Sequence, residues 1–195
     1  MLDTILDSPL SPWLQLDTDA TDHIVISSRI RLARNFDCIL FTNRNDLSSL
    51  EKVNTISRGL LQPLKEADGH QYSNINLEQL SERERAILVE KHMMSPALEE
   101  KLPYRNLVVS DDASIVIMVN EEDHLRIQSM VSGLRLHEAY EHALKIDKAI
   151  EAKYPYAFDE RFGYLTACPT NVGTGLRASV MPVSYTHLTL PTILL

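Results

Sequence analysis

Two short apolar runs, residues 107–109 and 115–119, place the strongest constraint on how this chain can fold. Apolar residues that run together over about five positions are typical of buried strands. Asp111 and Asp112 lie between the two runs and favour a turn. The sequence therefore predicts a β-hairpin from Leu107 to Val119.

An acidic stretch, Asn120-Glu121-Glu122-Asp123-His124, follows this hairpin directly, and the apolar residues Leu125 and Ile127 come after it. The acidic stretch is thus expected where a strand leaves the core. Three adjacent carboxylates repel one another and are ordinarily solvated on a loop. That interpretation and a functional one are equally compatible with the pattern taken alone.

A further strand is predicted over residues 23–32, where side chains alternate between two faces. One face is largely apolar and carries Ile24, Ile26, Ser28, Ile30 and Leu32. The other face carries Val25, Ser27, Arg29 and Arg31. Two arginines spaced two residues apart project from one side of such a strand. An ordinary exposed sheet face with solvated arginines is the alternative.

Helices are predicted around these strands. Asp46 opens one that runs to about Leu61, before Pro63, and Ser81 with Glu84 forms the capping-box spacing of another that reaches His92. The clearest helical periodicity covers residues 132–154, and residues 162–167 resemble another strand. The fold class predicted is α+β, with a mixed, largely antiparallel sheet flanked by helices.

Composition limits the classes of function. The chain has 195 residues, of which 44% are hydrophobic, and carries a net charge of −8. This charge argues against binding nucleic acid or a membrane surface, so any anion site must be a local group of arginines. Cys38 and Cys168 form neither a disulfide framework nor a zinc-ligand set. No signal peptide or membrane span is recognisable, which predicts a soluble, cytoplasmic protein.

Arginines near predicted strands indicate where an anion could bind. The common nucleotide-binding loops GxxxxGK[ST] and GxGxxG are absent from the sequence. Instead, arginines lie on or beside predicted strands at Arg29, Arg31, Arg126 and Arg177. Guanidinium groups bind phosphate oxygens in a bidentate manner, so these arginines predict a site for a polyphosphate.

Three segments carry a resemblance to a known family. They are Ser27-Ser28-Arg29-Ile30-Arg31, the acidic stretch 120–124, and residues 168–177, which read CPTNVGTGLR. Together they resemble the guanidino (phosphagen) kinases. The short segment before Ser27 and the residues Arg177 to Met181 are similar to those of the bacterial protein-arginine kinases within that family.

The resemblance implies roles for matching positions. Glu122 would orient the substrate guanidinium, and Arg126 and Arg177 would join it as catalytic residues. Cys168 matches the family's reactive cysteine, which tunes the site; a small buried hydrophobic residue is the alternative. The implied ATP-binding residues are Ser27, Ser28, Arg29, Ile30, Arg31, His92, Arg126, Arg177, Ala178, Ser179, Val180 and Met181.

The resemblance also implies an activity and its context. The activity is ATP-dependent phosphorylation of arginine residues in proteins, with Mg²⁺, in the cytoplasm and in the stress response. Implied partners are arginine-bearing protein substrates, an activator protein, Clp-type protease machinery and a second copy in a homodimer; no metal-ligand set of the chain's own is expected. Two alternatives stay open: a kinase for a free guanidino compound, and a catalytically inactive module that binds nucleotide or protein.

The match to the family ends before the chain does. Residues 1–181 are expected to form the N-terminal part of a catalytic domain, with residues 1–21 as an arm that docks through Trp13. Residues 182–195 do not match and resemble translated adaptor or vector sequence. We therefore expect a truncated domain that is inactive alone. The missing half would supply a second substrate-binding glutamate, another phosphate-binding arginine and a region that binds phosphoarginine.

Overall fold

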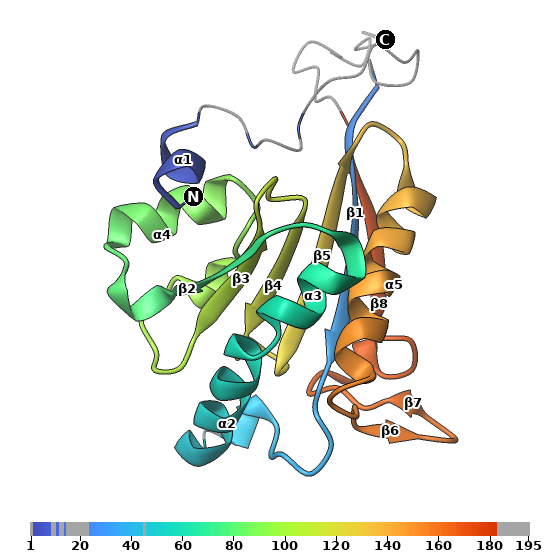
Figure 1. The fold of residues 1–195 in the computed structure, drawn as a ribbon. Coiled ribbons are helices and arrows are strands. Elements are labelled where there is room, and N and C mark those ends of the chain that lie inside the picture. Colours follow the sequence, from blue (N-terminus) through green and yellow to red (C-terminus); the bar gives the residue numbers. More distant parts are fainter. Residues whose placement is uncertain (1, 9–10, 12–13, 15–23, 45, 183–195) are drawn as a thin grey trace, which may run out of the picture.

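A single six-stranded sheet organises the computed structural model, which describes residues 2–8, 11, 14, 24–44 and 46–182 (Figure 1). Trp13 and residues 183–195 of the expected tail 182–195 lie outside these ranges, whereas Pro182 is described and ends β8. The sheet order is β2 (Tyr72–Asn76), β3 (Asn106–Ser110), β4 (Ile115–Val119), β5 (Leu125–Ser132), β1 (Val25–Arg34) and β8 (Leu176–Pro182). Every described pair in it is antiparallel.

Helices cover the sheet unequally. The helices are α1 (Leu2–Asp7), α2 (Leu47–Arg58), α3 (Leu61–Asp68), α4 (Glu82–Glu90) and α5 (Leu136–Glu151). Short 3₁₀ turns are η1 (Thr42–Arg44), η2 (Leu77–Gln79), η3 (Pro96–Leu98) and η4 (Pro169–Asn171), and a small hairpin joins β6 (Phe158–Asp159) to β7 (Gly163–Tyr164). The α+β class predicted from the sequence is confirmed.

The two faces of the sheet have different cores. On one face α5 packs against β1 and β5, and α3 packs against α5 and β2, with Ile30, Ile127 and Ile146 buried in this core (Figure 1). On the other face a second core joins Leu88 of α4 to Leu107 and Met118. This second core covers β2, β3 and β4, and beyond it the same face of β1 and β8 carries Arg29, Arg31 and Arg177.

The predicted hairpin is confirmed, and its burial has a simple cause. Residues 106–110 and 115–119 are buried at every position, because β3 and β4 lie inside both cores. The alternation predicted for β1 is confirmed at Ile30 and Leu32, which are both 2% exposed. The strand begins at Val25 rather than at residue 23, so Ile24, predicted to lie on its apolar face, precedes the strand and is 68% exposed.

Helix ends differ from the sequence prediction where backbone polar groups have other partners. The helix expected to stop before Pro63 ends at Arg58, and α3 follows with Pro63 inside its first turn, where no backbone N–H is needed. The capping box of Ser81 and Glu84 is confirmed. The helix expected from Ser132 begins at Leu136, because β5 continues through Ser132.

The strand expected over residues 162–167 is reduced to β7, Gly163–Tyr164. Gly163 has φ 78°, and a Cβ there would lie 2.6 Å from the carbonyl oxygen of Gly173. The close approach of these two glycines holds the β6–β7 hairpin against the segment that leads into β8. Within the described residues, none of the helices combines the length and apolar character that crossing a bilayer requires.

Candidate functional site

Strand register brings four separate arginines to one face of the sheet. Arg31 of β1 lies opposite Gln128 of β5 and opposite Arg177 of β8. Ala33 lies opposite Arg126. Because directly opposed residues of antiparallel strands project to the same side, Arg29, Arg31, Arg126 and Arg177 share the face away from α5. We call this set the arginine face.

The arginines repel one another. Burial, followed by the neighbouring Arg29, Arg126 and Arg177, lowers the pKa of Arg31 from 12.5 to about 10 in total. Burial and Arg126 also lower the pKa of Arg29. The buried Nε of Arg31 has no hydrogen-bond partner among the described residues. Guanidinium groups held close together, with the Arg31 Nε left without a partner among the described residues, favour binding of an anion.

A pocket of matching character lies on the arginine face. It is a small hollow open to solvent, lined by Arg31, Ala33, Arg126, Asn171, Gly175 and Arg177. Gly175 has φ 61°, and a Cβ there would lie 2.5 Å from the carbonyl oxygen of Ala33. Only glycine therefore allows the chain to pass this close to β1 at the edge of the pocket.

A second, larger pocket of about 600 Å³ continues along β1 and β8. Its lining is Ser27, Arg29, His92, Met130, Ser179, Val180, Met181 and Pro182, which combines apolar and polar groups. His92 is exposed and has φ 58°, and the side-chain amide of Gln128 donates to its carbonyl oxygen at 2.7 Å. This bond fixes the turn after α4 at the pocket, and the role of His92 beside the nucleotide stays a prediction.

Other residues of the implied ATP site lie on the opposite face. Ile30 is in the α5 core, and the hydroxyl of Ser28 donates to the Gly133 carbonyl oxygen at 2.8 Å. By register, Ala178 lies opposite Ile30 and Val180 lies opposite Ser28, although Val180 also lines the larger pocket. The structure thus brings Ser27, Arg29, Arg31, Ser179 and Met181 together on the arginine face. The side chains of Ser28 and Ile30 take part in the fold instead.

The three acids of the acidic stretch differ in environment. Glu121 is buried, pairs with Arg126 at 2.8 Å and accepts from the hydroxyl of Ser95 at 2.8 Å. Glu122 is exposed, and its carboxylate lies 3.4 Å from Arg126. The loop expected to be solvated therefore presents one carboxylate to solvent, next to the arginine face.

Asp123 is the third acid and holds the loop in place. It is 2% exposed, and its Oδ1 accepts from the amide of Asn35 and from the backbone N–H of Ala167, both at 2.6 Å. Cys168 follows Ala167 in the chain and is half-buried, and its Sγ lies 3.0 Å from the hydroxyl oxygen of Thr170. The cysteine predicted to tune the site is therefore tethered to the loop that carries Glu122.

His124 supports the same loop as a neutral ring. Its Nδ1 accepts from the backbone N–H of Phe36 at 3.0 Å, which assigns the proton to Nε2, 2.9 Å from the Leu40 carbonyl oxygen. Burial lowers the pKa of His124.

We expect acid to destabilise the protein through this histidine. The unfolded chain takes up the His124 proton near pH 6.5, above the pKa of the folded state, so stability present at pH 7 is lost as pH falls below about 6.5. The measurement is the free energy of unfolding in urea at pH 7.5 and 5.5. His124→Asn, which keeps an acceptor near Phe36, should be less stable at pH 7.5 and show a smaller loss on acidification. An equal loss in both proteins would contradict the assignment.

Several residues of the site carry no sequence signal. Asn35, Thr42, Ser95 and Gln128 are ordinary polar residues in the sequence, yet each holds the acidic stretch or His92 through a hydrogen bond. Thr42 donates its hydroxyl to the carbonyl oxygen of Glu122. Only their contacts in the folded chain identify them.

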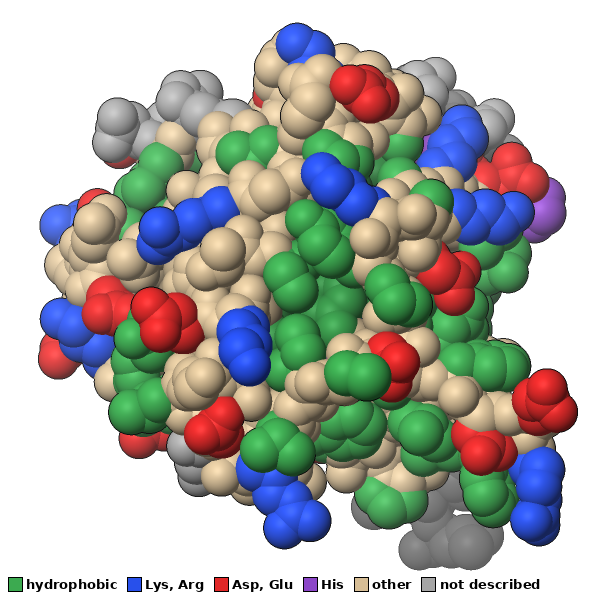
Figure 2. Space-filling view, turned by 60° about the horizontal axis from the view of Figure 1, so that its bottom comes forward, with side chains coloured by type: hydrophobic (Ala, Val, Ile, Leu, Met, Phe, Trp, Pro, Cys, Tyr) green, Lys and Arg blue, Asp and Glu red, His purple; other side chains and the backbone are tan. Residues whose placement is uncertain are grey.

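The end of the molecule that carries Glu122 also has apolar surface. The loop after β1, helix α2 and the β6–β7 hairpin form this end (Figure 1). Apolar side chains gather in the middle of this surface, with basic and acidic side chains around them (Figure 2). Large exposed hydrophobic residues of these elements are Leu40, Leu47, Phe158 and Phe162.

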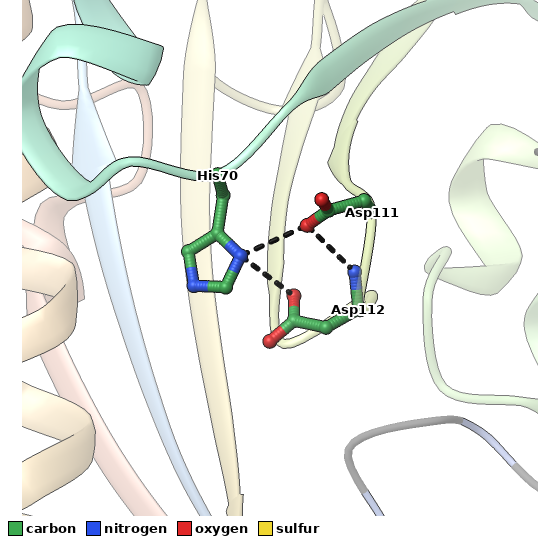
Figure 3. A group of neighbouring side chains, drawn as sticks. All are labelled: His70, Asp111 and Asp112. Carbon is green, nitrogen blue, oxygen red and sulfur yellow. Dashed lines mark hydrogen bonds and ion pairs between the residues drawn. The ribbon is translucent and has the colours of Figure 1, made fainter.

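One further group of histidine and acids lies away from the arginine face. His70, Asp111 and Asp112 meet at the β3–β4 turn, with His70 Nδ1 2.8 Å from Asp111 Oδ1 (Figure 3). The acidic stretch follows the other end of β4, so the whole strand separates the two groups. These side chains are partly exposed and pair with one another.

Known proteins share both the sequence and the fold. Residues 52–193 match the family model described as ATP:guanido phosphotransferase, C-terminal catalytic domain. This range enters the segment 182–195, whose foreign origin stays a hypothesis. Protein-arginine kinases of Halothermothrix orenii and Syntrophomonas wolfei are 44% and 45% identical to this chain over 180 and 170 residues. Those matches cover 92% and 87% of this chain.

The chain spans about half the length of these relatives, 50% and 47%. Among solved structures, the duplicated taurocyamine kinase from Schistosoma mansoni with bound transition state analog components matches 91% of this chain and 25% of its own. Its TM-score is 0.73 and its identity 28%. Lombricine kinase matches 91% of this chain and 51% of its own, with a TM-score of 0.69 and 25% identity. The family model covers most of the chain, and relatives of similar sequence and solved structures of similar fold are kinases of guanidino compounds or protein arginine. The chain therefore belongs to the ATP:guanido phosphotransferase family.

Proposed function

We propose that this chain is part of a protein-arginine kinase, which transfers the γ-phosphoryl group of ATP to a guanidinium nitrogen of arginine in a protein. One observation carries the proposal: Glu122 is the exposed carboxylate of the acidic stretch and lies 3.4 Å from Arg126 on the arginine face. An acceptor cation and a polyphosphate can therefore meet at one place.

The arginine face would hold the triphosphate. Arg31, Arg126 and Arg177 line the smaller pocket, where they would neutralise charge on the transferring group. The larger pocket, with His92 and Met130, would take the nucleoside. The smaller pocket has no carboxylate in its lining, so Mg²⁺ would enter bound to phosphate oxygens of the nucleotide rather than to a protein cage.

The acceptor chemistry explains the need for Glu122. A guanidinium stays protonated far above neutral pH, and removing its proton at pH 7 costs about 9 kcal/mol, so an ordinary carboxylate cannot remove it beforehand. Glu122 can bind the cation and align one nitrogen with the γ-phosphorus. As the P–N bond forms and the bond to the leaving ADP oxygen breaks, the nitrogen loses its proton to the Glu122 carboxylate.

A protein acceptor is favoured over a small one. The relatives named protein-arginine kinase are about 44% identical to the chain, whereas the taurocyamine kinase is 28% identical. The apolar surface near Glu122 offers contacts for a polypeptide around the arginine (Figure 2). A kinase for a free guanidino compound is the second candidate, supported by the fold shared with taurocyamine and lombricine kinases.

We further propose the cellular context that the family resemblance implies. The protein would act in the cytoplasm with Mg²⁺-ATP as part of a stress response. Its partners would be an activator protein, Clp-type protease machinery and a second copy of itself. The curated relatives support the kinase at the centre of this proposal through their printed name.

The test is phosphotransfer from Mg²⁺-ATP to an arginine-rich protein, scored as acid-labile phosphate. This chain is compared with a chimera in which the second half of the Halothermothrix orenii relative follows residue 181, with free arginine as the control acceptor. We expect activity in the chimera, on protein, and none in the chain alone. Labelling of free arginine only would favour the second candidate. ATP binding without transfer in either protein would favour an inactive binding module.

A further inference from the structure

A buried arginine at the end of β1 contacts three separate parts of the chain. Arg34 is 3% exposed, and its Nε and Nη2 donate to the carboxylate of Asp147 in α5 at 3.0 and 2.8 Å. Its Nη1 donates to the carbonyl oxygen of Thr174 at 2.9 Å. The guanidinium carbon lies 3.8 Å from the ring centroid of Tyr164. Arg34 thus joins helix α5, hairpin β6–β7 and the turn before β8.

The contact with the turn is close and specific. The backbone N–H of Ala33 donates to the Gly175 carbonyl oxygen at 2.9 Å, beside the bond from Arg34 to Thr174. A Cβ on Gly175 would lie 2.6 Å from Nη1 of Arg34. The guanidinium therefore fills the space that a side chain at this turn would need, and it fixes the path of the backbone there.

The Thr174–Gly175 turn borders the smaller pocket, which is proposed to hold the triphosphate. Gly175 and Ala33 line that pocket, and Arg177 follows two positions after Gly175 at the start of β8. In the described sheet β8 is an edge strand paired only with β1. The position of Arg177 therefore depends on the β1–β8 pairing and on what anchors the turn before β8.

We propose that Arg34 is a positioning residue of the nucleotide site. Through the Thr174–Gly175 turn it positions the backbone at the edge of the smaller pocket and the side chain of Arg177 for contact with the phosphates of ATP. The proposal rests on the proposed function. Arg34 does not line the pocket, so its role differs from that of the arginine face. Asp147 keeps the buried charge of Arg34 paired and holds the guanidinium group in the orientation that points Nη1 at Thr174.

The experiment separates positioning from stability. Replacing a buried ion pair by apolar residues of similar size is often neutral for folding, whereas removing one partner is strongly destabilising. The double variant Arg34→Met, Asp147→Leu should stay folded but lacks the bond to Thr174. Arg85→Met is the matched control, because Arg85 is also a buried arginine (5% exposed) that donates to a backbone carbonyl, here Leu80, in the second core.

Two measurements on the full chain decide the outcome. ATP affinity by calorimetry should fall at least tenfold in the double variant and stay within twofold in Arg85→Met. Exchange of the Ala33 amide proton should become at least tenfold faster in the double variant, with the amides of β4 unchanged. Faster exchange of the Ala33 amide with unchanged ATP affinity would overturn the proposal. Unchanged exchange at Ala33 in the double variant would also overturn it, whatever the ATP affinity. Absence of ATP binding by the unsubstituted chain would count against the proposed function instead.

Discussion

Glu122→Gln should abolish most phosphotransfer while leaving nucleotide binding intact. We expect the transfer rate of the chimera to fall about 10²–10⁴-fold, the usual contribution of a group that accepts a proton in the transition state. Glutamine is isosteric and the site is exposed, so the free energy of unfolding should change by less than about 0.5 kcal/mol. The dissociation constant for ATP should change little, because Arg126 stays paired with Glu121 at 2.8 Å.

Glu121→Gln is the matched control for this prediction. Glu121 is buried and neutralises Arg126, so its loss should lower stability and disturb Arg126 rather than remove the acceptor carboxylate. Single-turnover assays with saturating ATP, together with urea unfolding, distinguish the two variants. If Glu122→Gln transfers phosphate at a rate within threefold of the unsubstituted chimera, the carboxylate role belongs to another residue.

Arg31→Met should remove function and stabilise the unliganded protein. Arginines that neutralise a transferring phosphoryl group contribute about 10³–10⁵ in rate, so the chimera should lose at least ~10³. Arg31 is also repelled by Arg29, Arg126 and Arg177. Burial is the largest cause of its lowered pKa, and these three arginines are the next. Removing this charge should add about 1 kcal/mol to the free energy of unfolding. The midpoint of thermal unfolding without ATP would then rise by about 2–4 °C.

Arg83→Met is the control for the charge change itself. Arg83 is exposed on α4 and outside both pockets, so neither activity nor the unfolding midpoint should move measurably. Thermal unfolding is measured with and without ATP, since ATP should stabilise the unsubstituted protein and Arg83→Met but not Arg31→Met. A lower midpoint for unliganded Arg31→Met would mean that Arg31 stabilises the fold and that the arginine face is not under electrostatic strain.

Local patterns in the sequence predicted the elements on which the site is built. The apolar runs gave the β3–β4 hairpin, and alternation along β1 placed Ile30 and Leu32 inside with Arg29 and Arg31 on the other side. These predictions succeeded because periodicity depends only on neighbouring residues. The prediction failed at Pro63 and at the start of α5, where the limits of an element depend on which backbone groups find partners elsewhere.

The sequence by itself determined where β1, β3 and β4 lie, and that arginines and a run of acids are available near them. Only the tertiary structure decided which of these groups can act. Glu121 and Asp123 are buried because Arg126, Asn35 and Ala167 neutralise or bond them, and Asn35 lies 88 residues away from Asp123 in the chain. Arg29 likewise bonds Ser179, 150 residues distant, through the pairing of β1 with β8. A charged or polar side chain is buried only where a partner offsets its lost hydration, and partners so far apart in sequence are set by strand register and packing.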